Sequence, residues 1–161
     1  MKNYRADNRS KEQFEKDIFE RTLKERELFK KWIALREKEE GRTIEWNDFA
    51  VGNDGRPLQK VNSQPDFEIV GEGLVESKFA FPMLKDNFHL KVGQVDHYIK
   101  LNASVLMVNG AETPEPEFTI LRPETLKEIQ LWSPKVRWFG FGNKLAYRIS
   151  VSKLIWRKLN V

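Results

Sequence analysis

The chain of 161 residues contains no cysteine and only two histidines, His89 and His97. The lack of cysteine excludes a disulfide framework, a thiol nucleophile, an iron–sulfur cluster and any cysteine-ligated zinc site. Two imidazoles are too few for a histidine-rich metal site, and we assign neither of them a role. A bound metal would therefore need oxygen ligands, as magnesium and manganese do.

Long hydrophobic runs are also missing. No stretch approaches the roughly 20 apolar residues that span a bilayer, and the N-terminus, Met1-Lys2-Asn3-Tyr4-Arg5, lacks the apolar run of a signal peptide. We therefore expect a soluble, cytoplasmic protein without membrane contact. The length fits a single domain, residues 1–161, and a hydrophobic share of 40% is adequate for a packed core.

Acidic residues are absent from the C-terminal end of the chain. The whole chain carries a net charge of +4, but the segment from Trp132 to Val161 has seven basic residues and no acid, interleaved with aromatic side chains. Lysine and arginine release phosphate counterions while flat rings accept bases, so this segment suits nucleic acid. The alternation over 146–151 is equally typical of a half-buried terminal strand. The residues that we expect to contact nucleic acid are Lys135, Arg137, Lys144 and Arg148.

Residues from Ser10 to about Glu40 predict one long helix, because they contain neither glycine nor proline and end at Gly41. Ser10 is the expected N-cap. Glu25 lies near the middle of the apolar side, where a carboxylate needs a partner, a metal or an exposed edge. The apolar residues on that side, which we expect to face the core, are Phe14, Ile18, Phe29, Trp32 and Ile33.

The order of elements predicts an α/β sandwich with a central mixed sheet, a long N-terminal helix and a β-rich C-terminal part. The continuous apolar run over 103–108 is typical of a buried central strand. After the first helix, the expected elements are a strand (43–51), a turn (53–57), a hairpin (66–70 and 74–80), a helix (91–102), the apolar strand (103–108), a loop (112–117), a strand (118–121), a short helix (123–131) and basic, aromatic strands.

The hairpin gathers charge on one face. A three-residue loop over 71–73 would pair Val70 with Leu74, and it would place Asp66 opposite Lys78 and Glu68 opposite Glu76. These four charged side chains then share one face of the hairpin, because opposed residues point to the same side. Solvated ion pairs across the strands would explain such a face without any function. The apolar residues on the other face are Phe67, Ile69, Val75 and Phe79.

Pro65-Asp66, the hairpin and Glu76-Ser77-Lys78 together resemble the PD-(D/E)XK nuclease superfamily. Members of this superfamily share the restriction-endonuclease-like fold, and they include restriction enzymes, Holliday-junction resolvases and many phage and repair nucleases. The likeness extends to the glutamate-bearing helix before the motif and to the helix that carries Gln94-Val95-Asp96-His97-Tyr98 after it. A Gln-x-x-x-Tyr pair at this place is a feature of one large branch. The resemblance covers about residues 10–110, the expected catalytic core, and leaves out the basic aromatic part, 111–161.

The resemblance implies metal-dependent hydrolysis of DNA phosphodiester bonds. By this interpretation Asp66 and Glu76 hold Mg²⁺, for which Mn²⁺ substitutes, and Lys78 acts either as a base or as an electrostatic stabiliser. Gln94 and Tyr98 are expected beside the metal site. A glutamate of the first helix joins it as well, and we choose Glu25 by helical phase, with Glu15 and Glu20 as alternates.

Two other functions remain open on the sequence. One is a nucleic-acid-binding or assembly module that keeps the fold without turnover, and the other is a nuclease subunit that acts on RNA. Resolvase-like cutting of branched DNA is one version of the leading hypothesis. A single domain makes one active site, so cleavage of both strands requires a homodimer or two successive nicks. No base-reading motif stands out, and we expect recognition of DNA backbone and shape.

Overall fold

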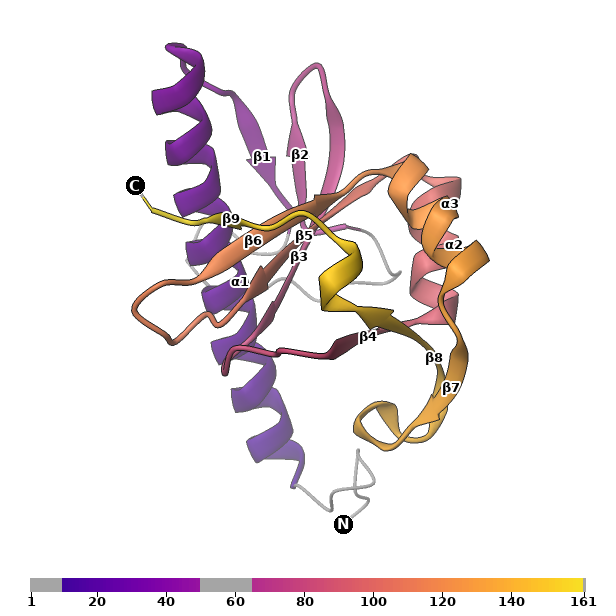
Figure 1. Ribbon diagram of the computed structural model, residues 1–161. Helices are drawn as coiled ribbons and strands as arrows, with labels where there is room; N and C mark the ends of the chain where they lie inside the picture. The colour runs from indigo at the N-terminus through magenta and orange to yellow at the C-terminus, as the bar shows by residue number, and fades with distance from the viewer. Residues whose placement is uncertain (1–9, 50–64, 161) are drawn as a thin grey trace.

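A computed structural model describes residues 10–49 and 65–160 and confirms the α/β fold class (Figure 1). A six-stranded mixed sheet has the strand order β1-β2-β3-β5-β6-β9, and a second sheet has the order β4-β8-β7. The expected turn at 53–57 and the end of the expected strand over 43–51 lie outside the described residues. In chain order the elements are α1 (Lys11–Glu40), β1 (Trp46–Asp48), β2 (Phe67–Ile69), β3 (Gly73–Ala80), β4 (Asn87–Lys91), α2 (Val92–Lys100), β5 (Ser104–Asn109), β6 (Glu117–Leu121), α3 (Pro123–Trp132), β7 (Lys135–Trp138), η1 (Phe139–Phe141), β8 (Lys144–Ser150), η2 (Val151–Lys153) and β9 (Arg157–Lys158).

The long helix α1 begins and ends where the sequence predicts. The Ser10 hydroxyl accepts a hydrogen bond from the backbone N–H of Gln13 at 3.1 Å, which satisfies one of the free donors of the first turn. At the other end Gly41 adopts a left-handed conformation with φ +66° and donates its N–H to the carbonyl of Glu37. Both ends are therefore set by local capping.

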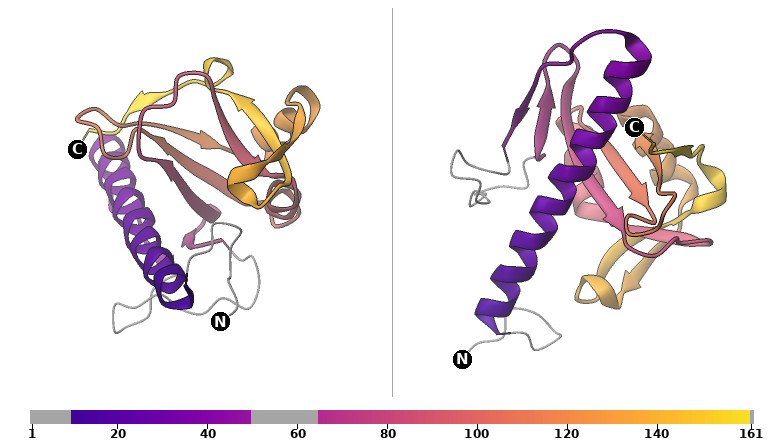
Figure 2. Two further views of the ribbon diagram at one scale, coloured as in Figure 1. Left: turned by 90° about the horizontal axis from the view of Figure 1, so that it is seen from below. Right: turned by 90° about the vertical axis from the view of Figure 1, so that its left-hand side faces the viewer.

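Only part of the apolar side of α1 meets the core. The C-terminal half of the helix lies along the six-stranded sheet, whereas the N-terminal half extends past it (Figure 2). Phe29, Trp32 and Ile33 are accordingly buried. Ile18, which the sequence placed on the core-facing side, is 45% exposed. That expectation was wrong because the sheet is too narrow to cover the first turns of the helix.

The central strand β5 is buried on both faces, as its apolar run predicts. It pairs in parallel with β3 and antiparallel with β6. Leu106 and Val108 belong to the core under α1, and Val105 and Met107 belong to a second core formed with α2, α3 and the three-stranded sheet. The six-stranded sheet is thus covered on both faces near its centre, where β3 and β5 lie between the two cores.

The β2–β3 hairpin forms, but its register differs from the expected one. Ile69 pairs with Gly73 and Glu68 pairs with Leu74, so the expected opposition of Glu68 and Glu76 was wrong. The reason is a tight turn in which the N–H of Glu72 donates to the carbonyl of Ile69 at 2.9 Å, with Gly71 at φ +83°. Continued by one residue, this register places Asp66 beside Glu76 instead of Lys78. The displacement is by two positions, so every side chain keeps its predicted face.

The three-stranded sheet contains a strand that the sequence analysis missed. β4 pairs antiparallel with β8, from Asn87 opposite Ser150 to Lys91 opposite Ala146. Lys91 is therefore the last residue of a strand, and the helix expected over 91–102 begins at Val92. Within the described residues, the helices fall short of the length and apolarity that crossing a membrane requires.

Candidate functional site

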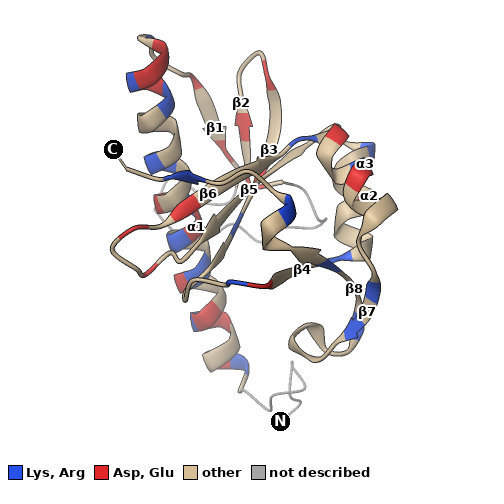
Figure 3. Ribbon diagram, viewed as in Figure 1, with Lys and Arg blue, Asp and Glu red and all other residues tan. Residues whose placement is uncertain are grey.

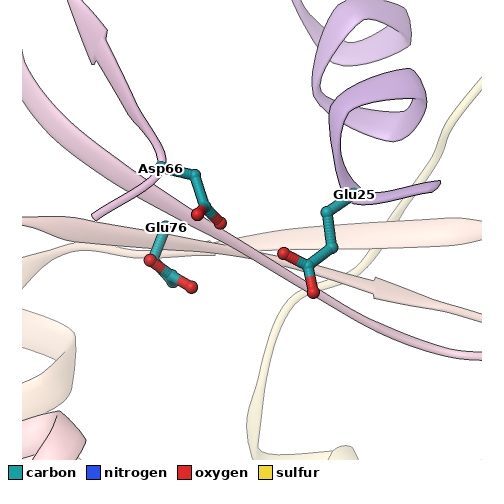
Figure 4. A group of neighbouring side chains, drawn as sticks. All are labelled: Glu25, Asp66 and Glu76. Carbon is teal, nitrogen blue, oxygen red and sulfur yellow. The ribbon is translucent and has the colours of Figure 1, made fainter. Parts of the chain in front are cut away.

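Three carboxylates from separate parts of the chain converge on one point (Figure 4). Glu25 comes from the middle of α1, Asp66 directly precedes β2, and Glu76 lies in β3. One oxygen of each side chain lies within 4.8 Å of the corresponding oxygens of the other two. Asp66 and Glu76 are buried and Glu25 is partly exposed. This acidic triad, Glu25–Asp66–Glu76, is a set of oxygen donors that could hold a metal ion.

The fold brings α1 to the triad at the edge of the sheet. β2 begins at Phe67, so among the described residues β3 has no partner strand on this side beyond Val75. The Ser77 hydroxyl donates a hydrogen bond to the main-chain carbonyl of Glu25 at 3.1 Å. Alternation along β3 turns Glu76 and Lys78 to the face opposite Ser77. β3 thus contacts α1 through Ser77, and the charged side chains of Glu76 and Lys78 point to the other face of the strand.

The triad makes an unfavourable arrangement of negative charge. The pKa of Glu25 is raised well above its ordinary value, first by burial and next by the charge of Asp66, while Lys78 opposes the rise. The charge of Glu76 and a hydrogen bond with Asp66 raise the pKa of Glu25 further. Carboxylates held this close repel one another unless a proton or a cation joins them. The electrostatics therefore fit the binding of a divalent cation.

Lys78 lies next to the triad, and the alternate first-helix glutamates do not. The Lys78 ammonium nitrogen is 3.7 Å from Glu76 Oε1, and its side chain is partly buried. Glu15 and Glu20 are exposed on the part of α1 that extends past the sheet. Of the three glutamates considered from the sequence, the structure brings Glu25 to the strand carboxylates.

The Gln94 and Tyr98 pair on α2 faces the same region. Tyr98 is 2% exposed, and its pKa is raised, mainly by burial and then by the charges of Glu76, Asp66 and Glu25. Its hydroxyl therefore stays protonated and adds no further negative charge to the triad. Gln94, one helical turn earlier, lines the same cavity as Glu25.

A cavity of about 200 Å³ lies beside the triad, between α1, β3 and the three-stranded sheet. Glu25 and Lys78 line one side of it, and His89, Lys91 and Phe141 line the side formed by the three-stranded sheet and its connecting turn. The sequence analysis missed these three residues: His89 and Lys91 lie on β4, which was not recognised, and Phe141 lies in the turn between β7 and β8. The alternation of the apolar residues Phe88 and Leu90 is a local signal of this strand, but it covers too few residues to stand out by itself.

The four basic residues expected to contact nucleic acid lie on β7 and β8 (Figure 3). All four are exposed, but they do not line one hollow. Arg137 and Lys144 line a depression of about 680 Å³ together with Lys91 and Gln94. Since Lys91 and Gln94 also line the cavity beside the triad, the two hollows adjoin. The other two basic residues lie apart from this depression: Arg148 beside His89, and Lys135 over the ring of Tyr147.

The chain matches no protein-family model, no curated protein and no solved structure. The resemblance to PD-(D/E)XK nucleases therefore rests on the sequence motif alone. The described residues establish a mixed α/β fold with a central mixed sheet, and the acidic triad at the edge of that sheet could hold a metal ion.

Proposed function

We propose that this protein is a metal-dependent nuclease that hydrolyses DNA phosphodiester bonds at the Glu25–Asp66–Glu76 triad. The observation that carries the proposal is the convergence of these carboxylates, one oxygen from each within 4.8 Å, with the Lys78 ammonium beside Glu76. Burying this much negative charge costs stability, so a structural role alone explains it poorly. A site that holds a divalent cation explains both the acids and the nearby lysine.

Asp66 and Glu76 are the residues that would hold the cation, with Glu25 as the third donor. When bound, the cation would activate a water molecule and neutralise charge on the scissile phosphate. The donors are oxygens only, which favours Mg²⁺ and allows Mn²⁺ in its place.

The residues around the triad suit phosphate chemistry. Lys78 would either stabilise the negative charge that develops on the phosphate or take a proton from the attacking water. Gln94 carries an amide that can donate hydrogen bonds to a phosphate oxygen from the cavity wall. Tyr98 is neutral, and it is buried in the core that α2 shares with β5 and α3.

DNA is the proposed substrate because the hollow beside the triad continues into a basic surface. Lys91, Arg137 and Lys144 line the adjoining depression, and these cations can follow a phosphate backbone away from the reacting bond. The contacts would be made to backbone and shape, without reading of base sequence. One triad cuts one strand, so cleavage of both strands would need a second copy of the chain or two successive nicks.

A cleavage assay tests the proposal. Supercoiled, linear and four-way-junction DNA are incubated with the protein in Mg²⁺, Mn²⁺ or EDTA, and the Glu76→Ala variant is run beside the wild type. We expect cutting that requires metal and disappears in the variant, whose fold is checked by circular dichroism. The proposal fails for these substrates if the wild type binds DNA and leaves every form intact with both metals.

A further inference from the structure

A single aromatic ring projects from the turn that joins β7 to β8. Phe139, the first residue of η1, is 80% exposed. The turn that carries it is closed by two hydrogen bonds: Gly142 donates its N–H to the Phe139 carbonyl at 3.1 Å, and Asn143 donates its N–H to the Trp138 carbonyl at 3.0 Å. Phe139 is therefore exposed on a turn that is held by backbone hydrogen bonds.

The neighbouring residues attach this turn to β4. The indole of Trp138 stacks on the imidazole of His89 with ring centroids 3.7 Å apart and planes 9° apart. Gly140 packs so closely on this indole that a Cβ at position 140 would lie 2.7 Å from Trp138 Nε1. The ring of Phe139 lies 5.0 Å from that of Trp138, at an angle of 47°. Trp138 is thus used for packing, and Phe139 is left to face outward.

The position of the turn links Phe139 to the triad. Gly140 and Phe141 line the cavity that also contains Glu25 and Lys78, so Phe139 directly precedes two residues of that wall. The Lys91 ammonium lies 5.3 Å from the centroid of the Phe141 ring. An exposed ring therefore directly precedes, in the chain, a part of the cavity wall where the Lys91 cation packs on Phe141.

We propose that Phe139 stacks on an unpaired base of the bound DNA strand, so that the protein prefers single-stranded, forked or branched DNA over an intact duplex. This inference rests on the proposed function for the identity of the strand. Cations bind the phosphate backbone, and an exposed aromatic ring beside them can stack on a base. The face of a base is accessible only where that base is not stacked on its neighbours in a duplex. The same combination of a ring and cations also suits an anionic membrane, but the turn forms the wall of the cavity beside the triad, which favours the nucleic acid.

Binding measured without turnover tests this role. Fluorescence anisotropy in EDTA compares a forked DNA with a blunt duplex of the same length, for the wild type, Phe139→Ala and Phe139→Trp. The matched control is Leu131→Ala, which removes an apolar side chain that is 87% exposed on α3, and melting temperatures verify that all variants fold. Vesicles with an anionic phosphatidylserine fraction form the second arm.

The wild type is expected to bind the fork more tightly than the duplex. Phe139→Ala should weaken binding to the fork by at least about fivefold with little change on the duplex, since stacking on a base is lost. Phe139→Trp and Leu131→Ala should bind as the wild type does. The inference is overturned if the wild type has no preference for the fork, if Phe139→Ala weakens both DNAs equally or neither, or if the variant loses only vesicle binding.

The two proposals fail in different ways. A protein that cuts DNA and keeps its preference for forks in Phe139→Ala contradicts the role of Phe139 alone. A protein whose fork preference depends on Phe139, but which leaves every substrate intact in Mg²⁺ and Mn²⁺, contradicts the proposed catalysis alone.

Discussion

The Ser77 hydroxyl donates a hydrogen bond across 3.1 Å to the main-chain carbonyl of Glu25. Ser77 is fully buried, and its neighbours in β3 are Glu76 and Lys78. One side-chain contact therefore joins the helix that carries the first acid of the triad to the strand that carries the last. The separation of these two acids depends on how closely β3 and α1 pack at this point.

Ser77→Ala should weaken both the fold and the metal site. A hydrogen bond of this kind contributes about 1 kcal/mol to the free energy of unfolding, and its loss also frees α1 to move away from β3. We expect a loss of that size in urea denaturation and weaker Mg²⁺ binding by calorimetry. Ser133→Ala is the matched control, because that buried hydroxyl has no hydrogen-bond partner among the described residues. Equal effects of the two substitutions would contradict the role of Ser77.

Glu25→Gln should stabilise the metal-free protein. The raised pKa of Glu25 means that the folded state binds the Glu25 proton more tightly than the unfolded state does. The contribution of this proton to the free energy of unfolding is therefore complete below the ordinary pKa of 4.5, and it is lost as the pH rises through the raised pKa. At about pH 7.5 in EDTA we expect the variant to melt at least about 2 °C higher than the wild type. Its melting temperature should also depend less on pH above this ordinary value. A lower melting temperature than that of the wild type would contradict this account, and exposed Glu15→Gln serves as the control.

Mg²⁺ should stabilise the wild type, and more so at higher pH. The cation competes with the proton that the raised pKa of Glu25 holds, so raising the pH favours the cation. At about 100 times the dissociation constant, binding adds about 2.7 kcal/mol to the free energy of unfolding. Thermal melts with and without Mg²⁺, at about pH 6 and about pH 8, measure this difference. Asp66→Asn should remove the stabilisation, and stabilisation that persists in Asp66→Asn would show that the cation binds elsewhere.

Lys78→Met should abolish cleavage and leave metal binding in place. Removal of a general base, or of a positive charge that stabilises the transition state, lowers the rate at least about 100-fold. The oxygen ligands of the cation remain in this variant. Lys78→Arg distinguishes the two roles, because a guanidinium keeps the positive charge but cannot take up a proton. A retained rate assigns Lys78 to electrostatic stabilisation, and a lost rate assigns it to base catalysis. Exposed Lys85→Met is the control, and full activity of Lys78→Met would exclude both roles.

The depression beside the triad should show itself in the dependence of DNA binding on salt. Each cation that neutralises a phosphate adds about 0.9 to the slope of log affinity against log salt concentration. We therefore expect Arg137→Ala and Lys144→Ala each to reduce the slope by about one. Lys127→Ala, which removes an exposed charge from α3, should leave it unchanged. An unchanged slope in the first two variants would place the DNA on another surface.

The sequence was most informative where local chemistry decides the structure. The ends of α1 depend on Ser10 and Gly41, which act within one turn of the helix. Alternation alone placed the apolar residues of the hairpin on one face, and helical phase singled out Glu25 among three glutamates. These features could be read before any tertiary contact was known.

Features set by distant contacts could not be predicted in this way. β4 forms because it pairs with β8, a segment far along the chain, and its own pattern is too short to stand out. The hairpin register depended on which residues close the turn, and these are Ile69 and Glu72, with Gly71 at φ +83° between them. The sequence also grouped four basic residues that the register of β7 and β8 divides between two faces, with Lys135 and Arg137 on one and Lys144 and Arg148 on the other.

The rate of plasmid nicking in saturating Mg²⁺ is the most direct test of the account, measured for the wild type, Asp66→Asn, Glu76→Gln and Glu68→Gln. Glu68 is the matched control, because it is an acid of the same hairpin that accepts a hydrogen bond from Asn47 and lies outside the triad. We predict that the two triad variants lose at least about 100-fold in rate and that Glu68→Gln nicks DNA as the wild type does. Nicking that survives in Asp66→Asn and Glu76→Gln, or that is equally lost in Glu68→Gln, would contradict catalysis at the triad.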